Sequence, residues 1–332
     1  MRAMEVWGSG EENIKEVEQP DPQPGPGEVQ VRIVAATLNY RDLAIPEGGG
    51  PYPVKMPYVP LSCGCGVVTA LGEGVTRVHV GDRVAPTFFQ PATTNGQDAA
   101  DFAKALGGPI NGVARELACF PHGGVVKIPD DLSDLEAATL PCAGLTAWNA
   151  LFGARATKPG DVVVLLGTGG VSIAGLQLAK AAGASAIITS SSDAKLARAR
   201  ALGADHTINY RALPAWGGRA HTLAGGSGAD VVLEVGGTGT LAQSLAALRP
   251  GGDVASIGLL AGGIVSQLDE ATAKLHRIRV GTRDQFEDML RALVRNRVRP
   301  VVDKVYPLKE LGKAMAALRA GTMVGKVGIQ IA

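Results

Sequence analysis

A glycine-rich turn in the middle of the chain has the residue types and spacing of a loop that binds phosphate. Its sequence is Leu165-Leu166-Gly167-Thr168-Gly169-Gly170-Val171-Ser172, directly after an apolar run. Gly167 permits a tight turn, and Gly169 lets the backbone approach an anion without a Cβ in the way. The helix that follows offers unpaired N–H groups and the positive end of its dipole. This context predicts a dinucleotide site, although Ser172 replaces the last glycine of the G-x-G-x-x-G pattern.

The end of the next apolar strand indicates which dinucleotide is preferred. Sites for NAD usually carry an acidic residue there, about 20 residues after the turn, to hold the ribose 2′-hydroxyl. This chain has Ser190-Ser191-Ser192 instead, with Lys195 close behind and the first carboxylate at Asp193. Hydroxyls and an ammonium suit a 2′-phosphate, so we expect NADP(H). Asp193 as a helix cap and Lys195 as a solvated residue are the structural alternatives, and both are compatible with phosphate binding.

The elements around this turn predict an α/β protein with two kinds of sheet. Apolar runs that alternate with helical patterns indicate a doubly wound parallel sheet; they cover residues 162–166, 186–189, 231–235 and 254–257. Short strands separated by Gly turns, at residues 29–33 and between 66 and 84, predict an antiparallel, barrel-like first domain. Residues 90–112 are polar and small, and we expect a long surface loop with a short helix.

The composition is that of a soluble globular protein. The chain has 332 residues, 46% hydrophobic and 19% charged, with a formal net charge of +1. This balance gives no electrostatic footprint for nucleic acid. Apolar stretches fall short of the roughly 20 residues of a membrane span, and the N-terminus lacks the apolar core of a signal peptide. Four cysteines in this length form no disulfide framework. We therefore expect a cytoplasmic protein with a small-molecule substrate, and neither nucleic acid nor membrane as partner.

Further motifs along the chain are Asn39-Tyr40-Arg41-Asp42, Gly72-Glu73-Gly74-Val75, Val80-Gly81-Asp82-Arg83-Val84, Ala137-Ala138-Thr139-Leu140-Pro141 with Thr146-Ala147, and Leu202-Gly203-Ala204-Asp205. Taken together, they resemble those of the medium-chain dehydrogenase/reductase superfamily, in particular its zinc-independent, quinone oxidoreductase-like branch. The resemblance runs nearly end to end.

The resemblance implies a domain plan and a set of cofactor contacts. It implies a GroES-like β-barrel catalytic domain at residues 1–125, a Rossmann domain at 126–265, and a C-terminal segment at 266–332 that returns to the catalytic domain. It also implies an oligomer, and we expect a homodimer. The residues expected to contact NADP(H) are Thr146, Gly167, Thr168, Gly169, Gly170, Val171, Ser190, Ser191, Ser192, Lys195, Tyr210, Gly236, Gly258 and Lys326.

The ligands of the family's catalytic zinc are mostly replaced in this chain. By the resemblance, Asn39 stands in place of the first Cys ligand, and Leu61-Ser62-Cys63 replaces Gly-His-Glu; only Cys142 remains. One thiolate cannot build a three-ligand site, so we expect no metal. Cys63-Gly64-Cys65 lacks a second pair or a nearby His, and the cysteines of the family's structural zinc lobe are absent from residues 90–112.

Without a metal, hydride transfer suits an acceptor that is already electron-poor, such as a quinone or an α,β-unsaturated carbonyl. Candidate catalytic donors to the developing negative charge are Asn39, Tyr40, Arg41 and Tyr52. For Tyr52, in Gly50-Pro51-Tyr52-Pro53, a structural role in a Pro-rich loop is the alternative, and Arg41-Asp42 could be an internal ion pair. Two other functions remain open, a zinc-free NAD(P)-dependent alcohol dehydrogenase and a non-enzymatic NADPH-binding protein.

Overall fold

The expected antiparallel strands belong to a seven-stranded mixed sheet in the computed structural model, which describes residues 1–50, 52–91, 102–258, 260–269 and 272–332. This sheet belongs to a first compact unit, made of residues Met1–Leu145 and Val280–Ala332. The path is β14-β15-β3-β4-β5-β7, and β6 pairs with β3. The strands are β3 (Glu28–Thr37), β4 (Cys63–Leu71), β5 (Arg83–Pro86), β6 (Leu117–Pro121), β7 (Val125–Lys127), β14 (Val302–Pro307) and β15 (Lys326–Gln330).

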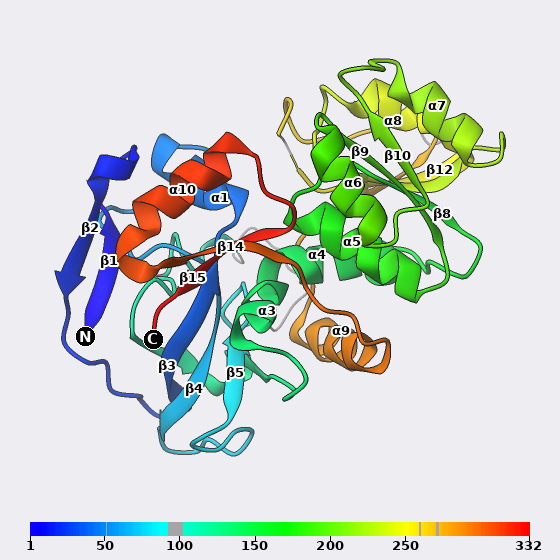
Figure 1. Cartoon of the computed structure of the whole chain (residues 1–332). Helices are drawn as coiled ribbons and strands as arrows, with labels where there is room; N and C mark the ends of the chain where they lie inside the picture. The colour runs from blue at the N-terminus through cyan, green and yellow to red at the C-terminus, as the bar shows by residue number, and fades with distance from the viewer. Residues whose placement is uncertain (51, 92–101, 259, 270–271) are drawn as a thin grey trace. The chain divides into compact units, whose positions relative to one another are not determined.

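Short helices and one strand pair complete the first unit (Figure 1). They are β1 (Arg2–Val6), β2 (Ile14–Glu18), α1 (Tyr40–Ala44), α3 (Asp134–Ala138), α9 (Arg283–Arg295) and α10 (Leu311–Ala320). Helix α9 follows from its sequence, because Thr282 caps its first turn and Phe286, Met289, Leu290 and Leu293 recur on one buried face. Cys142 lies on a π-helical turn, η4 (Leu140–Gly144), which follows α3.

The second unit, Thr146–Arg279, contains a six-stranded parallel sheet in the order β10-β9-β8-β11-β12-β13. Its strands are β8 (Val162–Leu165), β9 (Ser185–Ser190), β10 (His206–Asn209), β11 (Ala229–Glu234), β12 (Leu248–Ser256) and β13 (Lys274–Arg277). Helices α5 (Gly170–Ala181), α6 (Asp193–Ala201), α7 (Trp216–Leu223) and α8 (Leu241–Ala247) pack on this sheet. The strand order reverses at β8, which makes the end of β8 the switch point where ligands bind in such sheets.

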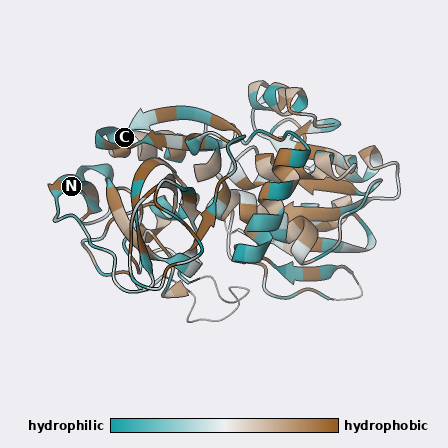
Figure 2. Cartoon of the chain, turned by 90° about the horizontal axis from the view of Figure 1, so that it is seen from below, coloured by the Kyte–Doolittle hydropathy of each residue, from teal (hydrophilic) through white to brown (hydrophobic). Residues whose placement is uncertain are grey.

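Apolar strands supply the cores of both units. Figure 2 shows that the strands are largely hydrophobic, whereas helix surfaces carry much of the hydrophilic colour. Val163, Val164 and Leu165 on β8 are fully buried, as expected of a strand covered on both faces. No helix among the described residues has both the length and the apolar character that crossing a membrane requires. The predicted fold class, a GroES-like barrel domain with a Rossmann domain, is confirmed.

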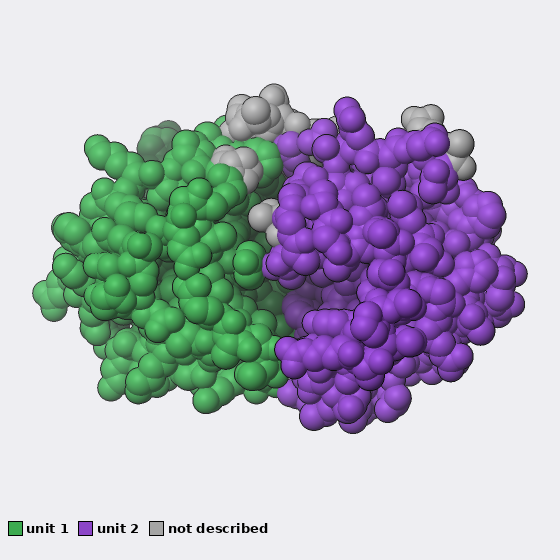
Figure 3. All heavy atoms as spheres, turned by 90° about the horizontal axis from the view of Figure 1, so that it is seen from above, with its two compact units in different colours: residues 1–145, 280–332 green, residues 146–279 purple. Residues whose placement is uncertain are grey.

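The compact units divide at different residues from those expected (Figure 3). The second unit begins at residue 146 rather than 126, because α3 packs on the barrel strands and Thr37 Oγ1 donates a hydrogen bond to the Ala138 carbonyl at 2.8 Å. It ends at residue 279 rather than 265, because β13 is the sixth strand of the parallel sheet and pairs with β12.

Two local expectations in the first unit also need correction. In the part of residues 90–112 that the structure describes, Ala105 and Leu106 are buried in the unit rather than lying on a surface loop; residues 92–101 lie outside the described residues. A strand was expected over residues 78–84, but β5 begins only at residue 83 and ends at residue 86. A turn precedes it, because Asp82 Oδ2 accepts a hydrogen bond from the His79 backbone N–H at 2.7 Å.

Candidate functional site

The turn between β8 and α5 has the features of an anion-binding loop. Gly167 has a φ of +74°, which a residue with a side chain would adopt only with strain. A Cβ added at Gly167 or at Gly169 would meet no atom within 4 Å, so space is open beside both. Thr168 is 3% exposed, and its Oγ1 has no hydrogen-bond partner in the described structure. Ser172 Oγ donates to the Leu166 carbonyl at 2.6 Å and so closes the strand–helix junction without the third glycine.

The serines after β9 lie where the second strand of the sheet ends. Ser190 is buried, and Ser192 Oγ caps α6 by accepting a hydrogen bond from the Lys195 N–H. The Asp193 carboxylate accepts a hydrogen bond from Asn209 Nδ2 at 2.9 Å. It is therefore engaged with the end of β10. Ser191 is partly exposed between these residues.

A second cation lies beside Lys195, and the sequence reasoning missed it. Burial lowers the pKa of Lys195, and the nearby positive charge of Arg211 lowers it further. Asn209 is in register with Ser190 across β10 and β9, so Tyr210 and Arg211 leave the sheet next to the serines. Tyr210 is 40% exposed. Arg211 could have been predicted from the sequence, because it directly follows Tyr210, which was already expected to contact the cofactor.

Gly236 and Gly258 have packing reasons to be glycine. A Cβ at Gly236 would lie 2.3 Å from Thr240 Oγ1, and one at Gly258 would lie 2.2 Å from the Val235 carbonyl oxygen. The loop after β11 is built on the buried Glu234 carboxylate, which accepts the Gly236 N–H at 2.8 Å. Thr146, the first residue of the second unit, is 5% exposed.

In the first unit, a buried polar cluster centres on Asn39. Its Nδ2 donates to Ser62 Oγ and to Cys63 Sγ, each at 3.1 Å. Its Oδ1 accepts a hydrogen bond from Lys326 Nζ at 2.5 Å, and the same ammonium also donates to the Leu38 carbonyl. Lys326 is 5% exposed. The structure therefore places this expected cofactor contact against Asn39, within the first unit.

Two thiols with opposite protonation tendencies belong to the same cluster. Burial acts to raise the pKa of Cys63, but hydrogen bonds from Cys142, Asn39 and Ser62 and the Lys326 charge lower it to about 6. The hydrogen bond with Cys63, followed by burial, raises the pKa of Cys142. The pair therefore favours a thiolate at Cys63 and a thiol at Cys142 near neutral pH.

The Arg41 guanidinium lies over the Tyr52 ring beside this cluster. Arg41 Nη1 donates to the Leu106 carbonyl at 2.6 Å, and its guanidinium carbon lies 4.3 Å from the Tyr52 ring centroid. Burial raises the pKa of the Tyr52 phenol, which stays protonated at neutral pH. Asp42 accepts the Asn39 backbone N–H at 2.7 Å and shapes the start of α1. Tyr40, by contrast, is 52% exposed.

The metal-ligand positions inferred from the resemblance carry a hydrogen-bond network. Asn39, Ser62 and Cys142 surround Cys63, and the Lys326 ammonium takes the amide oxygen that a cation would need. Within the described residues, no group of three or more His, Cys, Asp or Glu side chains is placed to hold a metal ion. This donor set does not fit catalytic zinc.

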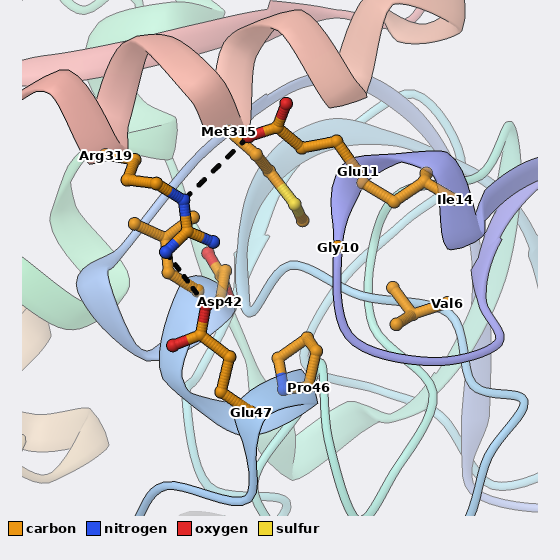
Figure 4. A pocket seen from close by; sticks show the side chains of 10 residues that line it. Val6, Gly10, Glu11, Ile14, Asp42, Pro46, Glu47, Met315 and Arg319 are labelled. Atoms are coloured by element: carbon orange, nitrogen blue, oxygen red, sulfur yellow. Dashed lines mark ion pairs between the residues drawn. The ribbon is translucent and has the colours of Figure 1, made fainter.

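A small pocket lies elsewhere in the first unit (Figure 4). It is lined by Val6, Gly10, Glu11, Ile14, Asp42, Leu43, Pro46, Glu47, Met315 and Arg319. Arg319 spans it, with Nη1 at 2.8 Å from Glu47 and Nε at 3.9 Å from Glu11. These ion pairs neutralise the two exposed carboxylates and join α10 to Glu11 of the N-terminal segment and to Glu47.

Comparison with protein families matches both units. Residues 25–130 match the alcohol dehydrogenase GroES-like domain, and residues 170–295 match the family described as zinc-binding dehydrogenase. A zinc-type alcohol dehydrogenase-like protein of Schizosaccharomyces pombe is 43% identical over 97% of this chain and 96% of its own length. An acryloyl-coenzyme A reductase of Metallosphaera sedula is 30% identical over 98% and 99%, respectively.

Solved structures agree over the whole chain. An NAD-dependent alcohol dehydrogenase superposes with a TM-score of 0.89 at 32% identity, covering 100% of both chains. A mycobacterial protein complexed with NADPH superposes with a TM-score of 0.83 at 30% identity, again covering 100% of both chains. The similarity therefore extends over both compact units.

Proposed function

The chain belongs to the medium-chain dehydrogenase/reductase superfamily, and we propose that within it this oxidoreductase uses NADPH, without zinc, to reduce a quinone or an α,β-unsaturated carbonyl. The network around Asn39 is the observation that carries this proposal. Lys326 donates a hydrogen bond to Asn39 Oδ1, and Asn39 Nδ2 donates one to Cys63 Sγ. Neither group of the amide is therefore available to a metal. An alcohol would then lack a Lewis acid to hold its alkoxide, whereas a conjugated acceptor needs only hydrogen-bond donors.

The residues of the β8–α5 turn fit a nicotinamide dinucleotide. The open space beside Gly167 and Gly169 and the unpartnered Thr168 hydroxyl suit a pyrophosphate at the N-terminus of α5. The bound cofactor would supply the hydride. We assign Lys195, Arg211 and the serines at 190–192 to its 2′-phosphate, because two cations and several hydroxyls gather there while Asp193 is held by Asn209.

The relatives' names favour both the proposed acceptor class and a second candidate. The acryloyl-coenzyme A reductase acts, by its name, on a conjugated thioester, which is an acceptor of the proposed class. The alcohol dehydrogenase names of other relatives favour alcohol oxidation as the second candidate. A screen of NADPH oxidation with quinones, enones, enoyl thioesters and aldehydes, run beside alcohol oxidation with NADP, separates the two. Turnover of simple alcohols only would overturn the reductase proposal.

Metal analysis tests the absence of zinc. Because the donor set around Asn39 does not suit a cation, the purified protein should contain less than about one zinc per ten chains. A chelator should leave turnover unchanged, since no metal would be lost. Elemental analysis and an assay after dialysis against the chelator provide the measurement. Stoichiometric zinc, or activity that falls with the chelator and returns with zinc, would contradict the proposal.

Cofactor titration tests the assignment of the cationic pair. NADPH should bind at least about tenfold more tightly than NADH, a difference of about 1.4 kcal/mol. Arg211→Ser should weaken NADPH binding about tenfold and leave NADH binding nearly unchanged, because only the 2′-phosphate loses a partner. Arg219→Ser, an exposed arginine of α7, is the matched control. Equal affinities of the wild type for the two cofactors would refute the assignment.

We also propose a homodimer formed through the parallel sheet. Strand β13 pairs with β12 and forms one end of the sheet order, and exposed Leu260 and Ile264 lie in the segment that leads to it. A strand at the end of the sheet order with nearby apolar side chains favours pairing with a second copy. Light scattering should give about twice the chain mass of 34.0 kDa. A single-chain mass at micromolar concentration would exclude this dimer.

A further inference from the structure

Two free cysteines of the first unit are held next to each other by separate elements. Cys63 begins β4, in register with Thr37 of β3. The hydrogen bond from Thr37 Oγ1 to the Ala138 carbonyl fastens the end of α3 to β3, and Cys142 follows on η4, which contacts β4. The two thiols interact through a side-chain hydrogen bond. The geometry therefore brings together two sulfurs that lie far apart in the sequence.

The other two cysteines differ in their surroundings. Cys65 lies on the same strand as Cys63, but its Sγ lies 3.5 Å from Asp134 Oδ1, and burial followed by this carboxylate raises its pKa. Cys119 lies on β6, and burial followed by the charge of Glu28 raises its pKa. Cys63 instead accepts a hydrogen bond from Asn39 and lies near the Lys326 ammonium. A pair of neighbouring sulfurs, with donors that stabilise a thiolate on one of them, is the pair suited to oxidation.

We propose that Cys63 and Cys142 form a reversible disulfide when the protein meets a hydroperoxide. The partly exposed Cys142 thiol first passes its proton to the Cys63 thiolate through their hydrogen bond. The Cys142 sulfur then attacks the O–O bond. The departing oxygen takes a proton from water and leaves as an alcohol, or as water, and Cys142 becomes a sulfenic acid. The Cys63 sulfur then attacks the sulfenic sulfur. An S–S bond forms, the sulfenic oxygen leaves as water with the remaining thiol proton, and the peroxide has taken two electrons in all. A dithiol reductant reverses the change by exchange.

The disulfide would alter the polar cluster as well as the sulfurs. In the reduced protein Cys63 Sγ accepts the Asn39 amide, and the Asn39 oxygen accepts Lys326. Bridging Cys63 removes that thiolate acceptor and its charge. We therefore expect the oxidised protein to lose most of its turnover and to recover it with dithiothreitol. Detection of the bond itself is independent of activity, so its failure is distinguishable from failure of the proposed function.

Peptide mapping of the full-length protein tests the pair. Tryptic peptide 56–77 carries both Cys63 and Cys65, so the measurement uses the Cys65→Ser background, in which peptide 128–155 supplies Cys142. After treatment with hydrogen peroxide, alkylation in denaturant and digestion, these two peptides should be linked, and dithiothreitol should separate them. Adding Cys119→Ser should retain the link, whereas adding Cys142→Ser should abolish it.

Three outcomes would overturn the proposal. Peroxide could leave both thiols free, or oxidise them to sulfinic acid without a linked peptide. It could join Cys119 to either of them. In the wild-type protein, peptide 56–77 could instead lose two hydrogens through an internal Cys63–Cys65 bond. That last bond would require backbone movement, because residues two apart on a strand point to the same face about 7 Å apart.

Discussion

Replacing Gly169 by alanine is expected to weaken NADPH binding about 100-fold, or about 2.8 kcal/mol. Gly169 has φ −77° and ψ −177°, an extended conformation that alanine adopts without strain. A Cβ at this position would meet no protein atom within 4 Å. The variant should therefore fold normally, and the new methyl group should fill only the space that a pyrophosphate needs at the start of α5.

Fluorescence titration with NADPH and thermal unfolding measure the two halves of this prediction. Gly218→Ala is the matched control, because Gly218 lies in α7 of the same unit and its added Cβ also meets nothing within 4 Å. Gly169→Ala should keep the unfolding temperature close to that of the wild type, because the site is extended and open. Gly218→Ala should keep it or raise it slightly, since alanine favours the interior of a helix. Only Gly169→Ala should lose affinity. An unchanged dissociation constant in that variant would show that the dinucleotide does not approach this turn.

The parallel sheet could be predicted well because its signals are local. A strand covered on both faces is a continuous apolar run, and the runs at residues 162–166 and 186–189 match β8 and β9 within about a residue. The glycines of the turn were predictable for the same reason, since Gly167 needs a positive φ at a strand–helix junction. Domain boundaries were less predictable, because they depend on contacts such as Thr37 with Ala138 between distant segments.

The composition of the polar cluster could be predicted only in part. The motif resemblance identified Asn39, Arg41 and Cys142, because each occupies a recognisable sequence position. It gave no indication that Lys326 donates to Asn39, since their contact spans 287 residues and depends on the pairing of β15 with β3. Leu106 was expected in a surface loop because the residues around it, 90–112, are mostly polar and small. Its burial and its carbonyl contact with Arg41 depend on tertiary packing, which local polarity does not report.

The two tyrosines proposed as donors differ in a way that makes the chemistry testable. Tyr52 is half-buried, with its ring under the Arg41 guanidinium and its pKa raised by burial. Cys142 and Asp42 lie close enough to influence that pKa, so the phenol belongs to the polar cluster. Tyr40 is 52% exposed on α1. We therefore propose Tyr52, rather than Tyr40, as the phenol that hydrogen-bonds the substrate oxygen as negative charge develops on it.

Tyr52→Phe should accordingly lower kcat/KM for a good enone by about 10²–10³-fold, the usual effect of removing one oxyanion donor. The ring contact with Arg41 is retained, so stability and NADPH affinity should change little. Tyr40→Phe removes a phenol of the same size from an exposed position and should keep nearly full turnover. Steady-state kinetics of both variants with one enone, beside NADPH titration, give the comparison. If Tyr52→Phe also keeps full turnover, neither phenol carries the step, and the charge must be stabilised by Asn39, backbone N–H groups or water.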